Sequence, residues 1–143
     1  MSALVEVKVE EALGTVLDWM IAKAEGLPIK LDPMGFRSGA NAGFWVWSDA
    51  PGGPMMKIGS DYSPSTNWSQ GGRLLGKFEI TFMLDAERSG EKYFAILNRP
   101  SRTSIGLQTA CGPDHLVAAM RAIASFILGG IVRVPSELLG AQS

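Results

Sequence analysis

"CGPDHLVAAMRAIASFILGG", residues 111–130, contains the most apolar stretch of this 143-residue chain. Its larger apolar side chains recur at the spacing of one helical face: Leu116, Met120, Ile123 and Ile127. The small alanines between them would let such a helix pack closely on a sheet. Arg121 and the pair Gly129–Gly130 interrupt the stretch too much for a membrane span, so we expect a buried helix of a globular domain.

The ends of this predicted helix are marked as well. Pro113 suits the first helical turn, where its missing N–H costs least, and Asp114 favours the positive end of the helix dipole. Gly129 suits the position that closes a helix. The segment "VRVPSELL" then closes the chain.

A second helical pattern lies near the N-terminus, in "EEALGTVLDWMIAKAEG", residues 10–26. Its apolar residues fall at helical spacing: Leu13, Val16, Leu17, Met20, Ile21 and Ala24. Acidic residues begin the pattern and Gly26 ends it, while Asp18 and Trp19 are expected on the flank of the helix. The alternating "VEVKV", residues 5–9, predicts a short strand ahead of it.

The remaining patterns predict strands. Residues 27–61 are rich in Gly and Pro and contain "FWVWS" and "MMKIG", which favour two or three short strands with Trp45 and Trp47 on one face. Residues 74–98 predict an antiparallel hairpin, and "RTSIGLQTA", residues 102–110, could add a strand. We therefore predict an α+β fold, a single domain over residues 1–143, with an antiparallel β-sheet packed by an N-terminal and a C-terminal α-helix.

The composition is that of an ordinary globular protein, with 46% hydrophobic and 19% charged residues. A formal net charge of −1 gives no general attraction to nucleic acid or anionic lipid, so we expect neither a DNA nor a membrane partner. A single cysteine excludes an intrachain disulfide and agrees with a reducing cytosol. The N-terminus lacks the basic start and apolar run of a signal peptide.

Few residues offer catalytic or metal chemistry. One His and one Cys cannot build a usual zinc site, no acidic cluster has calcium-loop spacing, and "GGRLLGK" lacks the Walker pattern. Cys111 and His115 could pair across one helical turn, but we favour a small buried Cys and a surface His. We expect no catalytic residue, no metal site and no cofactor.

"YSPSTNWSQGG", residues 62–72, has the composition of a binding loop: an aromatic face, neutral hydrogen-bonding groups and a Gly pair that lets a backbone approach closely. A nucleobase or sugar would use these groups. The alternative is a hydrogen-bonded turn held by one buried Trp. The candidate ligand-binding residues are Tyr62, Ser63, Ser65, Thr66, Asn67, Trp68, Gln70, Gly71, Gly72 and Arg73.

Three segments, "LDWMIAKAEG" (17–26), "YSPSTNWSQGG" (62–72) and "GPDHLVAAMRAIASFILGGIVRVPSELL" (112–139), together resemble the small phage-encoded family that includes NinX. Its middle motif reads Pro-Ser-Thr-Asp-Trp, a small residue, then Gln-Gly-Gly, and its C-terminal motif Gly-Pro, two variable positions, then Leu-Ile-Ala-Ala-Met-Arg. The residues that agree are Pro64, Ser65, Thr66, Trp68, Gln70, Gly71 and Gly72, with Gly112, Pro113, Leu116, Ala118, Ala119, Met120 and Arg121. Asn67 replaces Asp, Ser69 replaces Ala, and Arg73 stands where Pro is common.

The resemblance implies a phage or prophage origin, a location in the host cytoplasm and an accessory role outside the virion. It brings no catalytic residues. Asn67 in place of Asp argues against a carboxylate base or metal ligand at this position. It is compatible with a neutral hydrogen-bonding role or with an Asx-type cap.

Three functions follow as hypotheses. The first is a non-enzymatic protein that binds and sequesters a small nucleotide-derived immune signal of the host, a counter-defence sponge with possible phosphate contacts from arginines. Those arginines are Arg73, Arg99, Arg102 and Arg121, each of which could equally be a solvated surface charge. The second is a protein-interaction module acting on a host or phage protein. The third is an enzyme that degrades such a signal through Cys111, His115 or Asp61. A homo-oligomer would suit the first of these functions, because small sequestering proteins often build their pockets between protomers.

Overall fold

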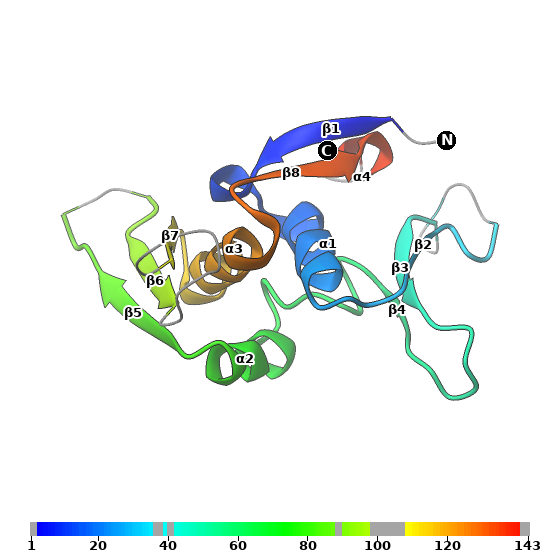
Figure 1. Cartoon of the computed structure of the whole chain (residues 1–143), viewed down its shortest axis with the longest axis horizontal. Coiled ribbons are helices and arrows are strands. Elements are labelled where there is room, and N and C mark those ends of the chain that lie inside the picture. The colour runs from blue at the N-terminus through cyan, green and yellow to red at the C-terminus, as the bar shows by residue number, and fades with distance from the viewer. Residues whose placement is uncertain (1–2, 36–38, 40–41, 88–89, 98–107, 141–143) are drawn as a thin grey trace.

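The computed structural model describes residues 3–35, 39, 42–87, 90–97 and 108–140. These residues form three small antiparallel sheets and four α-helices, which confirms the predicted α+β class. Helix α3 (His115–Leu128) lies between a three-stranded sheet on one side and helix α1 (Gly14–Ala24) on the other (Figure 1). The two predicted long helices are therefore the centre of the fold. Helices α2 (Trp68–Lys77) and α4 (Ser136–Gly140) add to them.

The sheet beside α3 contains the predicted hairpin, β5 (Ile80–Leu84) and β6 (Tyr93–Leu97), and on its other side β7 (Gln108–Gly112). The register aligns Phe82 with Ala95 and Ala95 with Ala110, on the face that α3 covers. A Cβ on Gly112 would lie 2.8 Å from the backbone nitrogen of Ala118, so this glycine permits the close approach of β7 to the helix.

Helix α3 begins at His115, later than predicted. Asp114 is the N-cap, and its carboxylate accepts a hydrogen bond of 2.9 Å from the Val117 N–H. Pro113 therefore precedes the cap and does not occupy the first helical turn. Gly129 ends the helix as predicted, with φ of 96°.

Helix α1 also begins later than its pattern indicated. The acidic residues belong to a separate 3₁₀ turn, η1 (Val9–Glu11), and the chain is extended at Ala12 and Leu13 before the helix starts at Gly14. Buried Val9 anchors this turn. Asp18 and Trp19, expected on the helix flank, are both buried because the loop after β4 and helix α3 cover that side of α1.

Two smaller sheets complete the fold. Strands β1 (Leu4–Lys8) and β8 (Ile131–Pro135) form an antiparallel ribbon. Strands β2 (Ile29–Leu31), β3 (Phe44–Trp47) and β4 (Met55–Lys57) form a three-stranded sheet. The rings of Trp45 and Trp47 meet edge to face with 5.7 Å between centroids, which confirms that they share a face.

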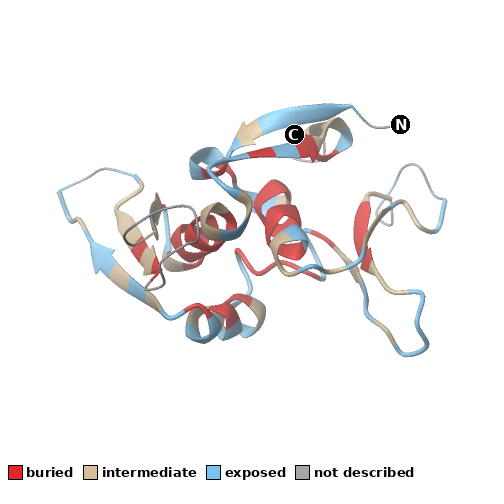
Figure 2. Cartoon of the chain, viewed as in Figure 1, coloured by how far each residue is buried: buried red, intermediate tan, exposed pale blue. Residues whose placement is uncertain are grey.

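Buried apolar side chains from α1, α3 and all three sheets form one cluster (Figure 2). Arg121 lies inside it at 1% exposure. Its Nε donates to the Ala12 carbonyl at 2.9 Å, and its Nη1 donates to the Glu91 carboxylate and to the Cys111 carbonyl, each at 2.8 Å. Arg121 therefore joins η1, β7 and the start of β6. This position corrects the expectation that it contacts a ligand phosphate.

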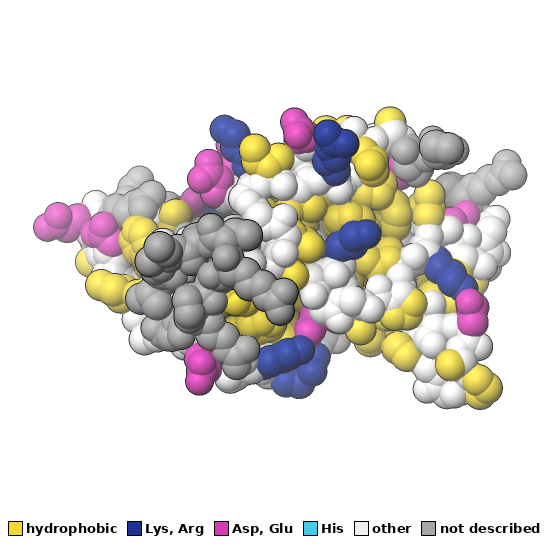
Figure 3. Space-filling model, viewed as in Figure 1, with side chains coloured by type: hydrophobic (Ala, Val, Ile, Leu, Met, Phe, Trp, Pro, Cys, Tyr) yellow, Lys and Arg dark blue, Asp and Glu magenta, His cyan; other side chains and the backbone are white. Residues whose placement is uncertain are grey.

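No helix in the described part of the chain is both long and apolar enough to cross a membrane. On the face shown in Figure 3, the Lys and Arg side chains are scattered and do not gather into one basic patch.

Candidate ligand-binding site at the start of helix α2

The stretch 62–73 divides into a buried turn and an exposed helix start. Tyr62, Ser63 and Ser65 are buried, whereas Trp68 begins helix α2 and is 57% exposed. The alternative interpretation was a turn held by a buried Trp. The turn does contain a buried ring, but this ring is Tyr62 and not Trp68. The predicted loop also becomes a helix from Trp68 onward.

Gln70 fastens the first turn of α2 to the preceding chain. Its Oε1 accepts a hydrogen bond of 2.6 Å from the Ser63 N–H, and its Nε2 donates to the Asp61 carbonyl at 2.7 Å. Both ends of the amide are thus engaged within the loop. Gln70 shapes the site and does not offer a free amide to a ligand.

Asn67 is the N-cap of α2. Its Oδ1 accepts hydrogen bonds from the Ser69 N–H at 2.8 Å and the Gln70 N–H at 3.4 Å. This geometry confirms the Asx-type cap that the sequence left open. The Asp that the family motif carries at this position would accept the same bonds and would also favour the positive end of the helix dipole.

Gly71 lets α2 lie directly on the turn and on α3. A Cβ at this position would overlap the Pro64 carbonyl oxygen and lie 2.8 Å from Leu116 Cδ2. Gly72 has more room, since its Cβ would be 3.8 Å from the Trp68 ring. The Gly pair therefore serves close packing of the chain on itself at Gly71.

Asp18, on helix α1, holds the turn by a hydrogen bond. Its Oδ1 accepts a hydrogen bond of 2.9 Å from the Ser65 N–H. Burial raises the pKa of this carboxyl to about 6, and the hydrogen bonding from Ser65 offsets part of that shift. Among the described residues, the Ser65 hydroxyl and the Trp19 Nε1 are buried without a hydrogen-bond partner.

Glu25 connects the end of α1 to α2. Its carboxylate contacts Lys77 Nζ at 2.7 Å and Arg73 Nη2 at 3.7 Å. Arg73 is a mostly exposed side chain in a long ion pair, as the solvated-charge alternative supposed. Burial raises the pKa of the Tyr62 hydroxyl, and the nearby charge of Glu25 adds to that effect. Arg99 and Arg102 lie outside the described residues.

Exposed Trp68 lies in a surface cluster of four rings, which we term the Trp68 cluster: Trp68, Phe82, Tyr93 and His115. The His115 ring centroid is 4.5 Å from that of Tyr93, 4.9 Å from that of Phe82 and 6.3 Å from that of Trp68. The cluster joins the first residues of α2 and α3 to strands β5 and β6. Of these four residues, sequence reasoning placed only Trp68 in the ligand-binding stretch and considered His115 only as a catalytic candidate, because no local pattern indicates that packing brings these segments together.

Cys111 and His115 do not form the suspected pair. The register places Cys111 opposite Phe94, on the sheet face away from α3, whereas His115 contacts Tyr93 and Phe82 on the other face. Cys111 Sγ instead lies 3.9 Å from the Glu91 carboxylate. No group of three or more His, Cys, Asp or Glu side chains gathers within the described residues.

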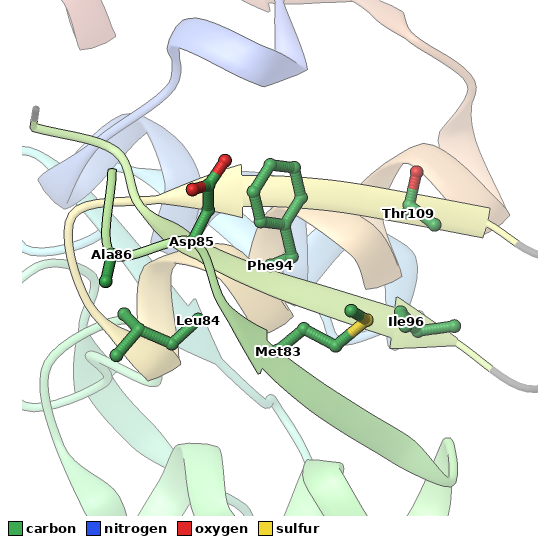
Figure 4. A pocket seen from close by; sticks show the side chains of 7 residues that line it. All are labelled: Met83, Leu84, Asp85, Ala86, Phe94, Ile96 and Thr109. Carbon is green, nitrogen blue, oxygen red and sulfur yellow. The ribbon is translucent and has the colours of Figure 1, made fainter. Parts of the chain in front are cut away.

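The largest of three described cavities, about 420 Å³, lies on the outer face of the β5–β6–β7 sheet (Figure 4). Two smaller ones, of about 190 and 230 Å³, lie near β3–β4 and near η1. None of the three is lined by a residue of 62–73. Nor is any of the three lined by a residue of the Trp68 cluster.

These features define a small α+β protein in which a clamped turn presents an exposed aromatic cluster. The chain belongs to the phage NinX family: the family described as "Bacteriophage P22, NinX" matches residues 8–125. The resemblance seen in the sequence is thereby confirmed, and the protein is a phage accessory protein of this family. No curated protein sequence matches it significantly.

Proposed function

We propose that this phage protein binds and sequesters a small nucleotide-derived immune signal in the host cytoplasm, without converting it. The observation that carries the proposal is the Trp68 ring, 57% exposed and next to His115 in a cluster of four rings. A nucleobase presents a flat face that stacks on such a ring, at about 1–3 kcal/mol per base. The neighbouring polar side chains of Thr66 and Ser69 are exposed at the same helix start.

The contacts that fix the backbone around Trp68 support a binding role. The Asn67 cap and the Gln70 clamp fix the residues on either side of it, and Asp18 holds the turn from below. A ring held in place before binding loses little conformational freedom when a ligand stacks on it. The polar residues of the family motif thus act mainly by preparing this surface.

The chemistry near Trp68 favours binding over catalysis. His115, the imidazole of the cluster, has aromatic ring contacts, and the Cys111 thiol lies on the opposite sheet face. Asp61 accepts a hydrogen bond from the Lys57 N–H at 3.1 Å. An enzyme that uses one of these three residues is therefore the weaker hypothesis.

Sequestration requires that the ligand be enclosed, and no described cavity encloses Trp68. We therefore include in the proposal a homo-oligomer in which a second copy covers the ring. If Arg73 contacts a phosphate group of the ligand, its guanidinium must first leave the Glu25 carboxylate. The present contact between these two groups is long, at 3.7 Å.

The test is a titration of the full chain with cyclic dinucleotides and ADP-ribose-type nucleotides, followed by tryptophan fluorescence and by chromatography of the ligand. Trp19 and Trp45 are buried and Trp47 is half-buried, so stacking on Trp68, the most exposed of the four tryptophans, would contribute most of the quenching. We expect saturable quenching and full recovery of intact ligand. Trp68→Ala should abolish binding, whereas Met55→Ala, an equally exposed apolar site in another sheet, should not. Absence of binding by every nucleotide, or time-dependent loss of the ligand, would refute the proposal.

A further inference from the structure

The β5–β6–β7 sheet has a second face, turned away from α3. The register places two cross-strand rows on this face: Thr81, Ile96 and Thr109 in one, and Met83, Phe94 and Cys111 in the other. Met83 is 62% exposed, which is high for a large apolar side chain near the middle of a strand. The Trp68 cluster occupies the opposite face, so the two surfaces are separate.

Two of the cavities adjoin on this face and share two lining residues, and we term the pair the outer groove. The 420 Å³ cavity is lined by Met83, Phe94 and Thr109 among others, and the 230 Å³ cavity shares Phe94 and Thr109 with it. Figure 4 shows the Met83, Phe94 and Thr109 side chains on three neighbouring strands. The outer groove therefore crosses the strands from the end of β5 to η1 and the junction of α3 with β8.

Carboxylates lie at both ends of the outer groove. Asp85 lines it beyond β5, and Glu10 lines it at η1. Neither makes an ion pair with another described residue, and no described Lys or Arg lines either cavity. Glu91 is different, since it is held by buried Arg121 at 2.8 Å. Within the described part of the chain, two carboxylates that have no ion-pair partner thus flank an apolar floor.

We propose that the outer groove binds a short apolar segment of another protein flanked on both sides by Lys or Arg. Strands lie about 4.8 Å apart, so crossing from β5 to β7 covers about 10 Å, the length of roughly three extended residues. Three apolar residues would meet Met83, Phe94 and Thr109, and the flanking cations would meet Asp85 and Glu10. Charge complementarity of this kind selects partners and orients them. The proposal is independent of nucleotide binding.

The test uses the full chain labelled with ¹³C at its methionine methyl groups and three capped peptides: Lys-Leu-Phe-Leu-Lys, Glu-Leu-Phe-Leu-Glu and Lys-Ser-Gly-Ser-Lys. The Met83 methyl signal reports on the groove, and Met55, on another sheet, is the internal control. We expect the first peptide to shift Met83 saturably, at least about tenfold more tightly than the second, while Met55 stays unchanged. The third peptide should bind weakly because it lacks the apolar centre.

The role of the two carboxylates is tested with the double variant Glu10→Gln and Asp85→Asn. Glu10 is exposed and Asp85 is half-buried, and both substitutions remove the charge while keeping the size of the side chain. This double variant should lose the preference for lysine over glutamate flanks, and Trp68→Ala should keep it. The proposal is overturned if no peptide shifts Met83, or if both apolar peptides bind equally well to the unsubstituted protein. It is also overturned if Met83 shifts with protein concentration alone, which would assign the groove to a second copy of the chain.

Discussion

Asp18→Asn should stabilise this protein at neutral pH. The folded state raises the pKa of Asp18 from 3.8 to about 6, so it binds the proton more tightly than the unfolded chain does. The free energy of unfolding therefore falls as the pH rises from about 4 to about 6, and above that window the full cost of the buried carboxylate is present. A difference of roughly 2 pKa units corresponds to about 3 kcal/mol.

The asparagine keeps the geometry and removes the charge. Its Oδ1 can accept the same hydrogen bond from the Ser65 N–H, and the neutral amide carries no charge that burial would disfavour. Urea unfolding between pH 3.5 and 8, followed by circular dichroism, measures the effect. We expect Asp18→Asn to be more stable by about 2–3 kcal/mol at pH 8. The slope of stability between pH 4 and 6 should flatten.

Asp49→Asn is the control, because this carboxylate is 81% exposed and pairs with Lys30 on the surface. Its stability should change by less than about 0.5 kcal/mol at every pH. The reasoning is refuted if Asp18→Asn is destabilising at pH 8, or if the slope between pH 4 and 6 survives the substitution. Destabilisation at pH 8 would mean that Ser65 binds the charged carboxylate more strongly than burial disfavours it. A slope that survives would mean that another group titrates between pH 4 and 6.

Three further substitutions and one control test the packing of the helix start and of the core, each by urea unfolding. Gly71→Ala should lower the free energy of unfolding by about 2 kcal/mol, because the new Cβ would overlap the Pro64 carbonyl oxygen. The control Gly76→Ala, which has open space around its Cβ, should stabilise α2 by up to about 1 kcal/mol. Equal effects of the two substitutions would argue against close packing at Gly71. Gln70→Ala should cost about 2 kcal/mol through its two lost hydrogen bonds, and a loss below about 0.5 kcal/mol would contradict the clamp. Arg121→Met should cost about 3 kcal/mol because two buried carbonyls lose their donor, and a neutral result would contradict its structural role.

Periodicity carried the successful predictions of the fold. The long apolar stripes of α1 and α3 and the alternation along β5 and β6 are strong local signals, and they located these elements within a few residues. Helix boundaries were less well predicted, because charged residues near a start need not belong to the helix. The acidic pair before α1 forms a 3₁₀ turn instead.

Helix α2 was missed because its sequence, "WSQGGRLLGK", contains three glycines and has low helix propensity. It forms because Asn67 caps it, Gln70 clamps it and Gly71 lets it pack on α3. The cap, the hydrogen bonds of Gln70 and the packing of Gly71 are contacts that form only together in the folded chain. The composition of the segment alone indicates a polar loop.

The candidate site was predicted in part. The sequence located the stretch and named Trp68, but about half of the predicted residues face inward, including Tyr62 and Ser65. The partners of Trp68 in the cluster, such as His115 and Tyr93, are far away in sequence and meet it only through the packing of α3 and the sheet. The burial of Asp18 likewise depends on a loop 47 residues further along the chain.

The most direct test of the central proposal is mass spectrometry of the protein purified under native conditions from cells that produce nucleotide immune signals, followed by denaturation and identification of the small molecules released. The account predicts an intact nucleotide in stoichiometric amount from the unsubstituted protein and from Met55→Ala, and none from Trp68→Ala, with the native mass giving the oligomer that holds it. Release of no nucleotide, or equal release from Trp68→Ala, would contradict it.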